Sequence, residues 1–421
     1  ELGIYLVDEA NLETHGLQGA LSRDPQWAHA YLDRAIRMVM RDKNHPSILF
    51  WSLGNESGVG ANHGAMAGWI RCYDPYRLIQ YESGDPDSRI TDIRAPMYPK
   101  MAWVEDVMAD ISDKRPMIMC EYAYSKSNSN GNFKKFWDYV DKYPRFQGGF
   151  IWDWADKALV QYTEDGREYW AYGGDFNEPI LDPVKDMCLN GVVLPDLTPY
   201  PGAYEIKNVQ APVQLKALDA LKGKFIVYNK YLDTSLAHLE IRWQMLEDGT
   251  KREEGVLPPL DVPAGQHAEL QIPFSLTDAS QGAEYFINIS FHLMEDTFWA
   301  PAGFEIYKEQ FGLPLKDAGM KPGFAVESIP NLLLEEDSSF YRLTGVDFYL
   351  TVDKKSGFLT DYRWQGRSIL KLGAKENFYR APTGIDEGQH GPDSYAHLWR
   401  QAGLDQLERM VRRVVAYQLD P

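Results

Sequence analysis

Two glutamates each come directly after an apolar segment that predicts a buried strand. Glu56 follows residues 47–53, and Glu121 follows residues 115–120. Two carboxyl groups on separate strand ends that face one cleft can cleave a glycosidic bond with retention, because one protonates the leaving oxygen while the other, ionised, attacks the anomeric carbon. Asn55, beside Glu56, is suited to hydrogen-bond a sugar hydroxyl. Taken alone, an acid after a strand is more often a turn or a helix cap, so the pair leaves both interpretations open.

A short motif near the start of the chain combines two further side chains that could bind a metal ion. Glu13 and His15 are two residues apart, so both could face one cation. A hard ion such as Mg²⁺ prefers carboxylates and water. One histidine and one glutamate make a weak metal signature, and composition alone favours a solvated loop.

The elements that must position these residues follow a repeating pattern over residues 1–208. Short apolar strands alternate with longer segments of helical periodicity. The predicted strands cover residues 4–8, 48–53, 78–82, 93–96, 117–120 and 149–154, and the predicted helices cover residues 24–42, 62–72 and 131–143. This alternation predicts a parallel sheet covered on both faces, and polar clusters at the strand ends are typical of a TIM (β/α)₈ barrel. Only six strands are visible, so we expect the start of the barrel to lie outside this chain.

The pattern changes to all-β over residues 209–318. Segments at 225–228, 238–245, 268–272 and 285–293 alternate apolar and polar residues and are separated by turn sequences, which predicts an immunoglobulin-like β-sandwich. A second β-rich unit occupies residues 319–421, with strands expected at 340–343, 348–351 and 357–364. The predicted fold class is therefore multidomain α/β plus all-β: a partial barrel, an immunoglobulin-like β-sandwich and a truncated second β-sandwich.

The composition excludes several classes of partner. The chain of 421 residues carries 43 basic and 61 acidic residues, a formal net charge of −18, so nucleic acid and anionic membranes would be repelled. No apolar run approaches the ~20 residues that a membrane span needs. The 3 cysteines form neither a disulfide framework nor a metal-binding spacing. Because no signal peptide is visible, we expect a soluble fragment of a longer protein, and a cytoplasmic or periplasmic location stays open.

Several longer motifs in the same order resemble a known enzyme family. They are residues 8–16, 41–47, 51–58, 96–98, 120–123, 147–154 and 172–176. Together they resemble the central barrel of the family-2 glycoside hydrolases, in particular the large microbial β-galactosidases. The likeness is continuous over residues 1–208 and continues more weakly to the end, where residues 319–421 resemble the start of the family's galactose-mutarotase-like C-terminal domain.

The resemblance assigns roles to the two glutamates and to the metal motif. It implies that Glu56, in Gly-Asn-Glu-Ser, is the acid/base and that Glu121, in Cys-Glu-Tyr, is the nucleophile. It also implies that Glu13, His15 and Glu56 hold Mg²⁺, whose charge would adjust the pKa of the acid/base carboxyl.

The resemblance also implies contacts with the sugar. Tyr98 matches a tyrosine that neighbours the nucleophile, and Trp152 matches the aromatic floor under the galactose. Asn190 matches a ligand of a Na⁺ ion that touches the 6-hydroxyl. Tyr124 stands where the family usually has a histidine near the 6-position, and Val59 also replaces a histidine. A tyrosine can still donate to O6, so galactose stays the expected sugar.

These assignments predict a retaining β-galactosidase that acts on terminal non-reducing β-galactosyl residues through a covalent galactosyl-enzyme intermediate. A β-glucuronidase or β-mannosidase of the same family is one alternative, although a glucuronidase would need a cation for the C6 carboxylate. A non-catalytic carbohydrate-binding fragment is another. The resemblance further implies a homo-oligomeric parent protein, and we expect the isolated chain to be inactive without the missing part of the barrel.

Overall fold

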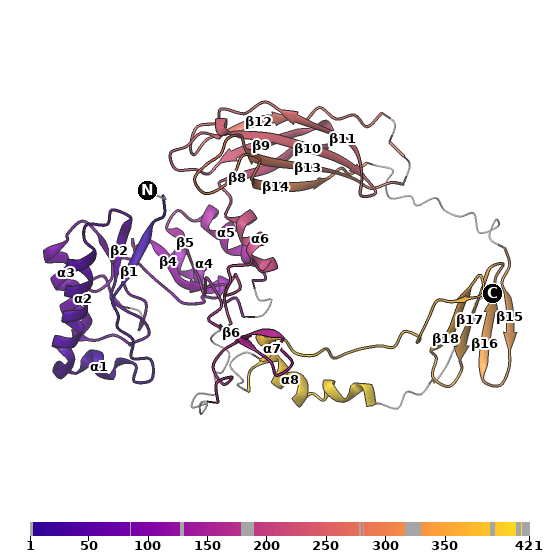
Figure 1. Cartoon of the computed structure of the whole chain (residues 1–421), viewed down its shortest axis with the longest axis horizontal. Helices are drawn as coiled ribbons and strands as arrows, with labels where there is room; N and C mark the ends of the chain where they lie inside the picture. The colour runs from indigo at the N-terminus through magenta and orange to yellow at the C-terminus, as the bar shows by residue number, and fades with distance from the viewer. Residues whose placement is uncertain are drawn as a thin grey trace. The chain divides into compact units, whose positions relative to one another are not determined.

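The chain divides into two compact units, Glu1–Gln210 and Ala211–Pro421 (Figure 1). The computed structural model describes residues 3–84, 86–126, 130–177, 189–277, 279–280, 282–315, 330–387, 392–409 and 414.

The first unit is built on parallel strands that follow one another in chain order. Strand β1 (Leu6–Glu9) pairs in parallel with β2 (Ile48–Ser52), and β2 pairs with β3 (Leu78–Gln80). Strand β4 (Met117–Tyr122) pairs in parallel with β5 (Phe146–Ile151). Single parallel bridges, Gln80 to Ile93 and Arg94 to Met117, connect these two groups. The arrangement confirms the predicted partial barrel.

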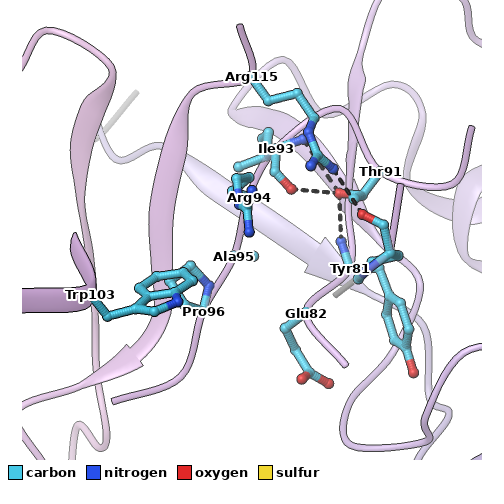
Figure 2. Close-up of a pocket in the computed structure, with 10 residues that line it drawn as sticks. Tyr81, Glu82, Thr91, Ile93, Arg94, Ala95, Pro96, Trp103 and Arg115 are labelled. Atoms are coloured by element: carbon cyan, nitrogen blue, oxygen red, sulfur yellow. Dashed lines mark hydrogen bonds between the residues drawn. The ribbon is translucent and has the colours of Figure 1, made fainter. Parts of the chain in front are cut away.

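The segment at 93–96 was expected to be a strand, but it forms only isolated bridges. Side chains replace part of the strand ladder here: the hydroxyl of Thr91 accepts the N–H of Tyr81 at 3.1 Å and donates to the carbonyl of Ile93 at 2.7 Å (Figure 2). Pro96 also lacks the N–H that a ladder needs.

Helices cover the sheet on the sides where its strands are apolar. The longest, α2 (Ala28–Asp42), buries Tyr31, Ala35, Met38 and Val39, which recur at helical spacing on one face. The others are α1 (Gly19–Arg23), the 3₁₀ turn η1 (Pro25–Trp27), α3 (Ala61–Tyr73), α4 (Met101–Ala109), α5 (Phe133–Lys142) and α6 (Pro201–Val209). One apolar cluster joins β2, β3 and the segment just after β1 to α2 and α3, and a second joins β4 and β5 to α4–α6. A hairpin of β6 (Leu159–Tyr162) and β7 (Glu168–Ala171) follows β5.

Residues 211–315 form a β-sandwich. A four-stranded sheet has the order β11-β10-β13-β14, and a three-stranded sheet has the order β12-β9-β8. The bounds are β8 (Val213–Asp219), β9 (Lys224–Asn229), β10 (Leu239–Glu247), β11 (Thr250–Leu257), β12 (His267–Gln271), β13 (Tyr285–Leu293) and β14 (Glu305–Gly312), with 3₁₀ turns η2 (Ala220–Lys222) and η3 (Leu236–His238). Alternate residues of β10 and β13 point into one apolar core, as the period of two requires.

The described residues after 329 form a single antiparallel sheet followed by short helices. The five-stranded sheet runs in chain order. Its strands are β15 (Leu333–Glu336), β16 (Phe340–Thr344), β17 (Phe348–Asp353), β18 (Leu359–Trp364) and β19 (Arg367–Ser368), and the helices are α7 (Gly384–Glu387), α8 (Tyr395–Gln401) and η5 (Leu404–Arg409). One described layer is consistent with the predicted start of a second sandwich. The predicted boundary between residues 318 and 319 lies outside the described residues.

Candidate active site

Acidic residues lie at the carboxyl ends of three parallel strands of the first unit. Glu9 ends β1, Glu56 follows β2, and Glu121 lies near the end of β4. Parallel strands bring their carboxyl ends to one edge of the sheet. Burial raises the pKa of Glu121, and the charges of Glu56, Glu9 and Glu13 raise it further, which is consistent with their lying at one edge. The structure therefore brings the two predicted catalytic glutamates into one site.

Tyr98 fixes the position of Glu121. Its hydroxyl donates to Glu121 Oε2 at 2.5 Å, and its backbone N–H donates to the Glu121 carbonyl at 2.8 Å. Burial raises the pKa of Glu121, the charge of Glu56 raises it further, and the Tyr98 hydroxyl opposes both effects by stabilising the ionised form. The prediction that Tyr98 neighbours Glu121 is thus consistent with the geometry.

Glu56 has a strained backbone. Its φ of +39° lies in the left-handed region, as do the φ of Tyr98 (+44°) and Ala123 (+50°). Such conformations cost on the order of 1–3 kcal/mol in non-glycine residues and cluster at functional sites. Gly54, two residues before Glu56, has φ +128°, and a Cβ there would lie 2.5 Å from the Leu12 carbonyl oxygen, so only glycine fits.

Glu82, which was not among the candidate site residues predicted from the sequence, stabilises the strained conformation of Glu56. The backbone N–H of Glu56 donates to Glu82 Oε1 at 2.7 Å. Burial raises the pKa of Glu82 to about 8, and the charges of Glu56 and Glu121 add to that shift. The available signal was the one used for the other two acids, because Glu82 ends the predicted strand at 78–82.

Aromatic and amide side chains lie beside Glu121. The rings of Tyr98 and Tyr124 meet edge to face, with centroids 5.9 Å apart at 74°. The fully buried Asn190 donates through Nδ2 to the Tyr124 hydroxyl at 3.2 Å. Its backbone carbonyl accepts a hydrogen bond from the backbone N–H of Asp153. Trp152, the residue before Asp153, is half-buried, and its backbone N–H donates to the backbone carbonyl of Tyr122 at 3.1 Å. Through these contacts, four predicted sugar-binding residues lie near the end of β4: Tyr98, Tyr124, Asn190 and Trp152.

Asn55 is held beside Glu56 by its backbone. Its N–H donates to the Leu12 carbonyl at 2.9 Å, and its own carbonyl accepts the Ser57 hydroxyl at 2.7 Å. The side chain is half-buried at the same strand edge, as its predicted contact with a sugar requires.

The predicted metal ligands are near one another but do not form a ready-made group. His15 Nε2 lies 3.6 Å from Glu56 Oε2, and a parallel bridge joins Glu13 to Asn55. Within the described part of the chain, no three His, Cys, Asp or Glu side chains are grouped closely enough to hold a metal ion. The donor chemistry suits a hard cation, and the exposed side chain of Glu13 would have to turn toward Glu56 to complete the set.

None of the helices that the structure describes is both long and apolar enough to cross a membrane.

Comparison with known proteins supports the resemblance seen in the motifs. Residues 1–215 match the family model described as glycosyl hydrolases family 2, TIM barrel domain. Residues 225–314 match β-galactosidase, domain 4, and residues 344–419 match β-galactosidase small chain.

Individual relatives match nearly the whole chain. A β-galactosidase of Vibrio vulnificus is 38% identical over 433 residues, covering 97% of this chain and 41% of that protein. One from Photobacterium profundum is 39% identical over 431 residues, again covering 97% and 41%. A solved β-glucuronidase of Parabacteroides merdae matches 85% of this chain and 46% of its own, with 13% identity and a TM-score of 0.39, a likeness too low to carry an argument.

The chain therefore spans 41% of the length of these relatives. With half of its length matched by the barrel model, it belongs to the glycosyl hydrolases of family 2.

Proposed function

We propose that this chain supplies both catalytic carboxyl groups of a retaining β-galactosidase. The observation that carries the proposal is the setting of Glu121, whose Oε2 accepts a 2.5 Å hydrogen bond from Tyr98 while its carboxyl interacts electrostatically with Glu56. Two carboxyl groups at one strand edge match the needs of glycoside hydrolysis. The 38% identity to a β-galactosidase over 97% of the chain supports a galactoside as substrate.

In the first step, Glu121 is the nucleophile. Its ionised oxygen attacks the anomeric carbon and forms an ester, while the bond from that carbon to the leaving oxygen breaks and Glu56 gives its proton to the departing oxygen. The Tyr98 hydroxyl keeps Glu121 Oε2 oriented and favours the ionised form.

In the second step, Glu56 is the base. Its carboxylate takes a proton from water, the water oxygen attacks the anomeric carbon, and Glu121 leaves as a carboxylate. Two inversions at one carbon give net retention. The Glu56 side chain is 35% exposed, so water can reach it.

Four side chains are proposed to bind the galactosyl group. Trp152 would stack on its apolar face, Asn55 would bond a ring hydroxyl, and the Tyr124 hydroxyl would donate to O6. The amide oxygen of Asn190 would bind a Na⁺ ion beside O6, and this part of the proposal rests on the family resemblance and on the contact of Asn190 with Tyr124. Replacing Na⁺ with K⁺ should raise KM for a galactoside more than for a 6-deoxy analogue.

Mg²⁺ is proposed to bind Glu13, His15 and Glu56. The 3.6 Å approach of His15 to Glu56 supports this, as does the bridge that brings Glu13 beside Asn55. When bound, the ion would stabilise the negative charge of Glu56. Titration calorimetry should show a site that is weakened at least tenfold in Glu13→Gln. Unchanged affinity in that variant would exclude Glu13 as a ligand.

The test of the proposed function is covalent trapping. A 2-deoxy-2-fluoro-β-galactoside with a good leaving group should label the intact protein that carries this chain, and peptide mapping should find the label on Glu121. The Glu121→Gln variant should take up no label. A label on another residue, or faster turnover of an aryl β-glucuronide than of the matched galactoside, would overturn the proposal.

The assembly of the whole protein, its compartment and the inactivity of the isolated chain stay predictions. Light scattering on the intact protein would test the homo-oligomer.

A further inference from the structure

Three consecutive residues after β3 hold the loop that carries the acid/base. The hydroxyl of Tyr81 donates to the Gly58 carbonyl, Glu82 accepts the N–H of Glu56 at 2.7 Å, and the hydroxyl of Ser83 accepts the N–H of Gly58 at 3.0 Å. We refer to these three contacts as the loop clamp. The clamp grips both ends of the segment Glu56–Gly58.

Of the three contacts, the one from Glu82 acts directly on the acid/base. The peptide N–H of Glu56 and its left-handed φ of +39° together set the direction in which the Glu56 side chain leaves the backbone. The 2.7 Å hydrogen bond gives the partly buried N–H of Glu56 an acceptor, and this can offset the cost of that conformation. Without an acceptor, Glu56 would be free to relax to negative φ and turn its carboxyl away.

Glu82 has no competing partner in the described part of the chain. The bond from Glu56 is the single hydrogen bond of its carboxyl there. Arg94 and Arg115 line the same cavity of about 220 Å³, but both pair with Asp113, at 3.1 and 2.8 Å. Figure 2 shows the Glu82 carboxyl pointing away from both guanidinium groups. Because Glu82 does not pair with either arginine, its carboxyl is better explained as the acceptor for the backbone N–H of Glu56 than as a member of a structural ion pair.

We infer that Glu82 is a positioning residue that orients the acid/base Glu56 by accepting its backbone N–H. The inference rests on the proposed roles of Glu56 and Glu121. It predicts a particular kind of defect, because a misplaced acid matters only when the leaving group needs protonation.

The test compares two leaving groups in the intact protein. In Glu82→Ala, kcat/KM for phenyl β-galactoside should fall on the order of 10²-fold, while kcat/KM for 2,4-dinitrophenyl β-galactoside should change less than about threefold. Azide should raise kcat for the dinitrophenyl substrate and yield galactosyl azide, since this anion attacks the anomeric carbon in place of water, displaces Glu121 and needs no general base. Glu82→Gln keeps an oxygen acceptor and should stay within about fivefold of the unaltered protein.

Controls separate positioning from general damage. Ser83→Ala removes the neighbouring clamp contact at Gly58 and should affect both substrates by the same factor. If Glu82→Ala does not fold, Glu82→Asp withdraws the acceptor by one methylene and serves the same comparison. An equal loss on both substrates, or a Glu82→Gln as impaired as the alanine variant, would overturn the inference.

A readout that does not need turnover distinguishes this inference from the proposed function. Amide hydrogen exchange in a peptide spanning residues 53–58 should be faster in Glu82→Ala and unchanged in Glu82→Gln. Failure of trapping at Glu121 with this exchange pattern intact would contradict the proposed function alone. Unchanged exchange in Glu82→Ala would contradict the positioning role whatever the activity.

Discussion

Hydrogen bonds to the carboxyl oxygens of Glu121 and Glu82 influence the protonation state of each group. Burial raises the pKa of Glu121 and of Glu82 alike, so burial alone would tend to keep both protonated. Their hydrogen-bond donors differ. The Glu121 carboxyl accepts a hydrogen bond from the hydroxyl of Tyr98, whereas the Glu82 carboxyl accepts one from the backbone N–H of Glu56. A nucleophile must be ionised, and the Tyr98 hydroxyl is the group that favours that form.

Replacing Tyr98 with phenylalanine tests this role of the hydroxyl. A hydrogen bond to a charged group contributes about 1.5–3 kcal/mol, so kcat/KM should fall roughly 10- to 100-fold. Loss of the donor raises the pKa of Glu121 further, so the acidic limb of the kcat/KM profile should move to higher pH. Tyr122→Phe, which removes a buried hydroxyl bonded to Trp137, is the matched control and should lose little. An unshifted profile in Tyr98→Phe would contradict the role.

Tyr124 offers a test of sugar specificity at a single oxygen. If its hydroxyl donates to O6, Tyr124→Phe should lower kcat/KM for an aryl β-galactoside about 3- to 10-fold, the worth of one neutral hydrogen bond. An aryl β-D-fucoside, which lacks O6, should be hydrolysed as before. Equal losses on both substrates would show instead that the hydroxyl serves to hold Asn190, which donates to it at 3.2 Å.

For single residues, the sequence indicated which side chains are candidates for the site but not which atoms they contact. Glu56 and Glu121 became candidates because each follows an apolar segment, and the family motifs then favoured a catalytic role over ordinary turns. Glu82 satisfied the same strand-end rule but belonged to none of the motifs. Its contact is with a backbone N–H, and a backbone partner leaves no mark in the types of neighbouring residues.

Among the elements, periodicity was most informative where one face of a strand or helix is fully buried. Helix α2 lies close to its predicted range because its apolar residues recur at helical spacing, and strand β2 does so because it is a nearly continuous apolar run. Helix α4 was not predicted, and β8, β11 and β14 were also missed. The segment at 93–96 shows the opposite error, since Thr91 takes over hydrogen bonds that a ladder would have made. Side-chain competition of this kind is not visible in an apolar pattern.

Packing between α3 and β3 gives a pH-dependent stability. His63 is fully buried, with its ring stacked on Tyr81 at 4.1 Å and against the edge of Tyr31 at 5.2 Å. Burial lowers its pKa from 6.5 to about 4. The unfolded chain therefore takes up the proton first as pH falls, so the stabilisation present above pH 6.5 is lost progressively toward pH 4. The expected loss is about 3 kcal/mol.

His63→Phe should flatten this dependence because a phenyl ring keeps the stacking and cannot be protonated. Chemical denaturation at several pH values between 4 and 7.5 would measure the free energy of unfolding of both proteins. His29→Gln, at an exposed position on α2, is the control and should leave the dependence unchanged. Parallel curves for His63→Phe and the unaltered protein would contradict the assignment.

For the whole molecule, the buried apolar clusters follow the order of units along the chain. Two clusters belong to the barrel and one to the sandwich, and the sandwich cluster draws its buried members from residues 211–313 alone. The change from α/β to all-β was visible in the sequence because the period of the apolar residues changes from helical to alternating. What could not be predicted was the number of strands, since edge strands such as β11 expose much of their surface.

The sandwich core predicts that residues 211–315 fold without the barrel. Its two sheets bury Phe225, Trp243 and Ile287 against each other. This segment expressed alone should unfold in one cooperative transition, followed by the fluorescence of its tryptophans, Trp243 and Trp299. Ile287→Ala removes a fully buried side chain and should lower the free energy of unfolding by about 2–5 kcal/mol, whereas Gln244→Ala, exposed on β10, should change it by less than ~0.5 kcal/mol. A broad transition without a folded baseline, or equal effects of the two substitutions, would mean that the core needs the rest of the chain.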